Sequence, residues 1–224
     1  YKAGGLPRIL LELQDKLHLD ALTITGKTIG QNIEETHFSW QQDVVKSASN
    51  PVYREGGMAV LKGNLAPDTA IIKQSAASDS LLTHSGRAVV FDGLEDLANR
   101  IDSDDLDVNK EDILVLRYIG PKGAPGMPEA GLIPIPKKLA RQGVKDMVRI
   151  SDGRMSGTAS GTIILHVCPE AAEGGPLALV QTGDQISLNV NARSLHLHVD
   201  EVALANRRKT LDLSRFIAKR GYHK

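Results

Sequence analysis

The sequence predicts an α/β fold in which short strands form a barrel or a sandwich and the helices pack outside it. From about residue 55 onward, short runs of β-forming residues are separated by Gly, Pro and Asp, which favour turns. Helical patterns are few and short in the same region. Many short strands with few helices indicate a closed or nearly closed barrel or a two-sheet sandwich, and periodicity alone does not choose between them.

The segment before residue 46 has a different pattern, because its apolar residues recur at helical spacing. Apolar side chains at positions 6, 9, 10, 13 and 17 predict a helix from Leu6 to Leu19, with Pro7 in its first turn. A second short helix is expected from Thr28 to Glu35. Neither helix has an obvious partner nearby in the sequence. We therefore expect residues 1–45 to be a helical tail of another domain, followed by a linker around Ser47–Pro51.

Residues 46–224 are expected to form the barrel-like domain. Its predicted strands are Thr69–Lys73, Ala88–Phe91, Ile113–Tyr118, Met147–Ile150, Thr162–Val167, Leu177–Val180, Gln185–Asn189 and Ser194–Val199. Its predicted helices are Gly93–Ile101, with Asp92 as N-cap, Lys137–Gly143 and Val202–Arg208.

Composition excludes several classes of partner. Lys plus Arg and Asp plus Glu are 27 each, so no net charge attracts nucleic acid or an anionic membrane, and aromatic residues are only 4%. No apolar stretch approaches a membrane span and no signal peptide is visible. The single cysteine, Cys168, excludes an internal disulfide and suits a reducing cytoplasm. We expect a cytoplasmic protein with a small-molecule substrate.

Two glycine-rich loops are the most informative motifs. The first is GPKGAPGMPEAG at 120–131, and the second is SDGRMSGT at 151–158. Glycine at this density lets the backbone approach a ligand closely and leaves N–H groups free to meet an anion.

Both loops resemble the signature loops of the dihydroxy-acid dehydratase and 6-phosphogluconate dehydratase family. The resemblance extends to His166–Pro176 and to Gly57–Pro67. It implies a swivelling β/β/α domain with a mixed β-barrel core. It also implies that this chain corresponds to the C-terminal two-fifths of a dehydratase that is a homodimer or homotetramer.

The resemblance implies two cofactors. An iron–sulfur cluster, expected to be of the 2Fe–2S type, would be held by cysteines of an absent N-terminal domain, since one cysteine cannot hold a cluster. The isolated chain is therefore expected to be colourless and inactive. A Mg²⁺ ion would be bound between the two domains, with Glu129 as the single ligand from this chain. Without the resemblance, Glu129 would be interpreted as an acid that favours a helix start.

Ser156 and Thr158 are the candidate catalytic residues. Taken alone, they would be interpreted as a turn whose hydroxyls bond their own backbone. A hydrolase is disfavoured because Arg154 occupies the first glycine position of the Gly-x-Ser-x-Gly elbow. The resemblance implies that Ser156 abstracts the proton at C2 of the substrate and that Thr158 orients substrate or base. Lys122 and Arg154 are candidates for contacts with the substrate.

Other polar residues are given structural interpretations. His196 and His198 alternate with leucines, so both are expected on a solvated strand face. His166 is expected to be a core histidine, and Cys168 a small packed residue.

The motif variants indicate the substrate class. Branched-chain members tend to show Met-Arg-Glu and Arg-Phe-Ser-Gly-Gly, where this chain has Met127–Glu129 and Arg154–Thr158. The variants, together with the hydroxyl of Ser160, favour the sugar-acid branch, which acts on arabinonate, xylonate or gluconate. The expected reaction removes water from a 2,3-dihydroxy acid to give a 2-keto-3-deoxy acid. The alternatives are a branched-chain dihydroxy-acid dehydratase and a non-catalytic carboxylate-binding module.

Overall fold

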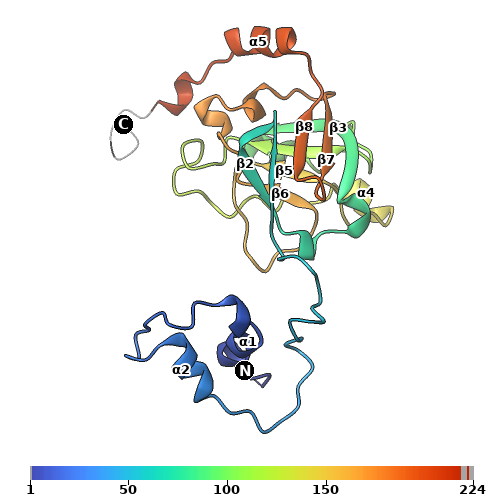
Figure 1. The fold of residues 1–224 in the computed structure, drawn as a ribbon. Coiled ribbons are helices and arrows are strands. Elements are labelled where there is room, and N and C mark those ends of the chain that lie inside the picture. The colour runs from blue at the N-terminus through green and yellow to red at the C-terminus, as the bar shows by residue number, and fades with distance from the viewer. Residues whose placement is uncertain (1, 218–220, 222–224) are drawn as a thin grey trace. The chain divides into compact units, whose positions relative to one another are not determined.

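A computed structural model of the chain describes residues 2–217 and residue 221. The chain divides into two compact units, Tyr1–Glu55 and Gly56–Lys224 (Figure 1). The last residues of the predicted barrel domain, 218–220 and 222–224, lie outside the described residues.

Unit 1 is helical and has little core of its own. It contains α1 (Gly5–Glu12), the 3₁₀ helix η1 (Gln14–Lys16) and α2 (Ile29–Glu34). The predicted first helix therefore ends seven residues early, because the chain tightens into η1 and is extended at Leu17. A capping box fixes the start of α2: Thr28 Oγ1 accepts from the Gln31 N–H, and Gln31 Oε1 accepts from the Thr28 N–H. Among the described residues of this unit, Ile33 is the only buried apolar side chain.

Unit 2 is a closed barrel of eight strands, which confirms the barrel and excludes the sandwich (Figure 1). The order around the barrel is β1-β2-β6-β5-β4-β3-β7-β8. The strands are β1 (Ala59–Gly63), β2 (Ala66–Ile72), β3 (Thr83–Asp92), β4 (Ile113–Arg117), β5 (Arg149–Ser151), β6 (Ile163–Leu165), β7 (Gln185–Asn189) and β8 (Ser194–Leu197). The helices of the unit are α3 (Leu94–Arg100), α4 (Lys137–Arg141) and α5 (Glu201–Lys209), with 3₁₀ turns η2 (Gln74–Ala76), η3 (Asp79–Leu81), η4 (Ala171–Glu173), η5 (Pro176–Leu179) and η6 (Ser214–Phe216).

Two secondary-structure predictions in unit 2 are wrong. Leu177–Val180 is not a strand, because Pro176 starts the 3₁₀ turn η5 there. Its leucines are buried all the same, so a short apolar run has the same sequence pattern in either conformation. Asp92 does not cap α3: Gly93 is the N-cap residue and makes no side-chain bond, whereas the Asp92 carboxylate accepts from Arg117 Nε at 2.6 Å.

Strands β3, β4, β5 and β6 are parallel neighbours, and this arrangement determines where the glycine-rich loops lie. Buried side chains cover both faces of β3 and β4. Ala88 and Val90 belong to the core cluster inside the barrel. Val89 and Phe91 belong to a second cluster that also contains Leu97 of α3. Because neighbouring parallel strands end at one edge, the loops that follow β4, β5 and β6 gather there.

No helix among the described residues is long and apolar enough to cross a bilayer.

Candidate active site

The two glycine-rich loops meet at the carboxyl edge of the parallel strands. The first loop follows β4 and carries Glu129, and the second follows β5 and carries Ser156. A backbone hydrogen bond from the Gly131 N–H to the Arg154 carbonyl, 2.7 Å long, joins them directly. A Cβ at Gly131 would lie 2.8 Å from that carbonyl oxygen and 2.4 Å from Leu165 Cδ2. Only glycine therefore permits this approach.

Arg154 makes two further contacts across the same junction. Its Nε donates to the Met127 carbonyl at 2.6 Å, and its Nη1 pairs with Glu129 Oε1 at 2.8 Å. Both members of the ion pair are about half exposed. The guanidinium thus lies on the loop that carries Glu129.

Ser156 and Thr158 are brought together by the second loop. Their hydroxyl oxygens lie 2.9 Å apart, and the Thr158 N–H points to Ser156 Oγ at 3.4 Å. Lys73, just beyond β2, donates from Nζ to the Gly157 carbonyl at 2.5 Å. Ser156 is half-buried and Thr158 exposed. The loop therefore presents two linked hydroxyls on a tethered turn.

Asp152, which the sequence analysis overlooked, ties three loops together. It is 2% exposed and accepts N–H bonds from Tyr118 (3.1 Å), Ile119 (3.1 Å) and Ala171 (2.9 Å). Burial raises the pKa of Asp152 above the usual range of an aspartate, although the three N–H groups favour its charged form. The one sequence signal for Asp152 is its position as an acid directly after a buried strand.

Glu170 was also overlooked, and it occupies part of the first glycine-rich loop. Its carboxylate accepts the N–H groups of Lys122 at 2.7 Å and Gly123 at 3.1 Å. A Cβ at Gly120 would lie 2.3 Å from Glu170 Oε2. The sequence led us to expect loop N–H groups free for an anion, but these two bind the protein's own carboxylate. The Lys122 ammonium pairs with Glu173 at 3.0 Å.

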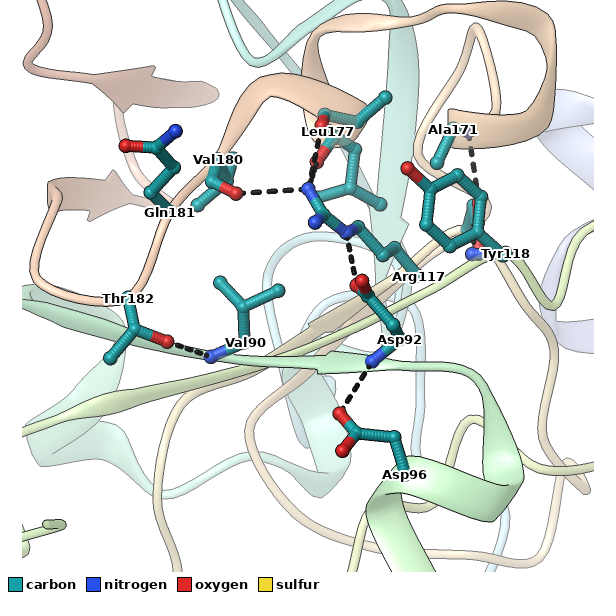
Figure 2. Close-up of polar contacts among 12 residues, drawn as sticks. Val90, Asp92, Asp96, Arg117, Tyr118, Ala171, Leu177, Val180, Gln181 and Thr182 are labelled. Carbon is teal, nitrogen blue, oxygen red and sulfur yellow. Dashed lines mark hydrogen bonds and ion pairs between the residues drawn. The ribbon is translucent and has the colours of Figure 1, made fainter. Parts of the chain in front are cut away.

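Arg117 supports the base of the first loop from the end of β4 (Figure 2). Its Nε donates to Asp92 at the end of β3, and its Nη1 donates to the carbonyls of Ala178 (2.6 Å) and Val180 (2.9 Å). These carbonyls belong to η5 and the residue after it, where the last carbonyls of a helical turn have no N–H partner within the turn. Arg117 thereby connects two strand ends to the turn that follows them.

A cavity of about 480 Å³ lies beside the loops, with Met127, His166, Cys168 and Glu170 among its lining residues. The predictions of a core histidine and a packed cysteine are wrong, because His166 and Cys168 are both exposed. His166 has φ 52°, so the chain turns there and the apolar strand pattern does not continue. His196 and His198 are exposed, as expected of a solvated face.

The described residues can contribute to a metal site but cannot complete one. They contain no group of three or more His, Cys, Asp or Glu side chains that could hold a metal ion. Glu129 fits a role as one hard oxygen ligand, since it is half exposed and only Oε1 is bonded among the described residues. The chain's single cysteine cannot hold an iron–sulfur cluster.

Comparison with known proteins gives consistent matches along the chain. The family model "Dihydroxy-acid/6-phosphogluconate dehydratase C-terminal" matches residues 43–224. L-arabinonate dehydratase from Rhizobium leguminosarum bv. trifolii is 48% identical over 92% of this chain and 36% of its own length. A 6-deoxy-6-sulfo-D-gluconate dehydratase from Pseudomonas putida is 47% identical over 92% and 36%. Dihydroxy-acid dehydratase 1 from Methanosarcina acetivorans is 43% identical over 92% and 37%.

The chain thus spans 36% to 37% of the length of these relatives. The family model covers both glycine-rich loops and every strand of the barrel. On these grounds the chain belongs to the dihydroxy-acid/6-phosphogluconate dehydratase family, whose C-terminal model matches residues 43–224.

Proposed function

We propose that the whole protein containing this chain is a dehydratase that converts an aldonic sugar acid to a 2-keto-3-deoxy acid. The observation that carries the proposal is the junction of the two loops, where Arg154 joins the segment bearing Glu129 to the segment bearing Ser156. One loop carries a carboxylate and the adjoining loop carries two hydroxyls, at the same edge of the sheet. These groups suit a substrate that must be both held and deprotonated.

Ser156 would take the proton from C2 of the substrate. The base would be the serine alkoxide, and a serine hydroxyl is too weak an acid to lose its proton unaided. Glu129 would supply one ligand to a Mg²⁺ ion, and such an ion would lower the pKa of nearby oxygen groups and polarise the substrate carboxylate. The Thr158 hydroxyl, 2.9 Å from Ser156 Oγ, would orient the base.

The cluster and the remaining metal ligands would come from the part of the protein that this chain does not contain. Support comes from its relatives, of which it spans little more than a third. Unit 1 gives independent support, because it leaves Leu22, Ile24 and Trp40 exposed. A 55-residue unit with this little buried apolar surface gains little stability alone, so we expect it to pack against the N-terminal domain.

The sugar-acid assignment rests on local chemistry. Thr158 adds an exposed hydroxyl to the second loop, where a polyol chain can bond it. The relatives named for sugar acids are 47% and 48% identical to this chain, against 43% for dihydroxy-acid dehydratase 1. A branched-chain substrate is the second candidate.

The test uses the whole protein, reconstituted with an iron–sulfur cluster and Mg²⁺. We expect higher kcat/KM for arabinonate, xylonate or gluconate than for 2,3-dihydroxyisovalerate. Ser156→Ala should abolish turnover, whereas Ser80→Ala, at an exposed position on η3, should leave it unchanged. A preference for dihydroxyisovalerate would overturn the sugar-acid assignment alone. Activity retained in Ser156→Ala would place the base elsewhere, and an unmodified protein inactive on every acid would favour a binding module.

A further inference from the structure

Arg154 contacts the Glu129 loop at three alternate residues. Its side-chain Nε bonds the carbonyl of Met127, its Nη1 bonds the carboxylate of Glu129, and its own carbonyl accepts from Gly131. The distances are 2.6, 2.8 and 2.7 Å. One residue of the second loop therefore fixes the backbone on both sides of Glu129 and the side chain between them.

The loop conformation at this point is one that the sequence alone does not favour. Met127 has φ 44°, in the left-handed region that a residue with a side chain rarely adopts. Such a conformation persists only where surrounding contacts impose it, and the bond from Arg154 to the Met127 carbonyl is one such contact.

We propose that Arg154 is a positioning residue for Glu129, holding Oε1 so that Oε2 is presented to a divalent cation. The inference rests on the proposed function, because it takes Glu129 as a metal ligand. An exposed glutamate has several rotamers, and a bound cation must select one. With Oε1 held by Nη1 and the flanking backbone fixed, the second oxygen already has one direction.

The positive charge of Arg154 disfavours cation binding at Glu129, whereas its hydrogen bonds favour that binding by fixing the carboxylate. A guanidinium bonded to Glu129 repels a cation that approaches the same carboxylate. Lysine at this position keeps the charge but loses the fork that bonds Met127 and Glu129 together. Arg154→Lys therefore isolates the positioning effect, and Arg154→Met removes charge and geometry at once.

The experiment measures Mn²⁺ binding to the whole protein by electron paramagnetic resonance, alongside the Mg²⁺ dependence of the initial rate. We expect Arg154→Lys to raise the dissociation constant for Mn²⁺ about ten-fold, as changes to residues that orient a metal ligand do. Saturating Mg²⁺ should restore most of kcat. Arg100→Lys is the matched control, because Arg100 forms a similarly exposed pair with Asp96 at 2.7 Å, on α3. Melting temperatures establish that each variant is folded.

Three results would overturn the proposal. Unchanged Mn²⁺ binding in Arg154→Lys with tighter binding in Arg154→Met would make Arg154 only a competing charge. Unchanged Mn²⁺ binding with a raised KM for the sugar acid would make it a substrate-binding residue. Equal Mn²⁺ binding in the unmodified protein and in Glu129→Gln would remove the metal role of Glu129 itself. The first two leave the proposed function intact, and the third does not.

Discussion

Replacing Asp152 by Asn should weaken the junction of three loops without changing its shape. Oδ2 accepts from Tyr118 and Ala171, and Oδ1 accepts from Ile119. Asparagine offers one oxygen and one NH₂ group in the same volume. If its oxygen takes the place of Oδ2, the Ile119 N–H faces another donor in a site that is 2% exposed.

The cost follows from these contacts. A buried N–H left without an acceptor costs about 1–3 kcal/mol, and the two retained bonds lose their charge assistance, about 1 kcal/mol each. Removal of a buried charge offsets part of this loss, since burial raises the pKa of Asp152 and so disfavours its charged form. We expect a net loss of roughly 2 kcal/mol, which lowers Tm by about 4–8 °C for a domain of this size.

The assay is calorimetric unfolding of the chain at neutral pH. Asp104→Asn is the matched control, because it makes the same charge change at an exposed loop position. A Tm for Asp152→Asn within about 1 °C of the control would refute the view that this carboxylate holds the loops.

Two further predictions concern pH and loop contact. Burial raises the pKa of Asp146, but hydrogen bonds from Ser78 and Thr162 and the charge of Arg149 together outweigh burial and lower that pKa below its usual value. Its stabilisation is therefore complete above the pKa of an unfolded aspartate, about 3.9, and is lost as pH falls through the lower folded value. Urea unfolding should show Asp146→Asn about 1–3 kcal/mol less stable at pH 7, with the difference vanishing in acid; a difference independent of pH would contradict this. Gly131→Ala should reduce kcat/KM of the whole protein at least about ten-fold, because its Cβ meets the Arg154 carbonyl. Gly56→Ala, with nothing within 4 Å of its Cβ, is the control, and equal kinetics in both variants would show that the loops need not touch.

The sequence by itself determined the class of the fold and the two loops of the candidate site. The predicted strand Ile113–Tyr118 is confirmed over Ile113–Arg117, because a strand buried on both faces leaves a continuous hydrophobic pattern. Glycine spacing identified the loops because close backbone approach excludes a Cβ, as at Gly131. These signals are local, so they can be recognised in the sequence without knowing which distant residues come into contact.

Tertiary structure alone decided which distant groups meet. Closure of the barrel pairs β1 with β8, and no local pattern specifies that pair. Asp152 binds N–H groups 33 and 34 residues away, and Glu170 binds one 48 residues away. An acid in a loop has the same sequence pattern whether it faces solvent or a set of backbone donors. The difference arises only when parallel strands place their carboxyl ends at one edge and their loops are forced to share the space there.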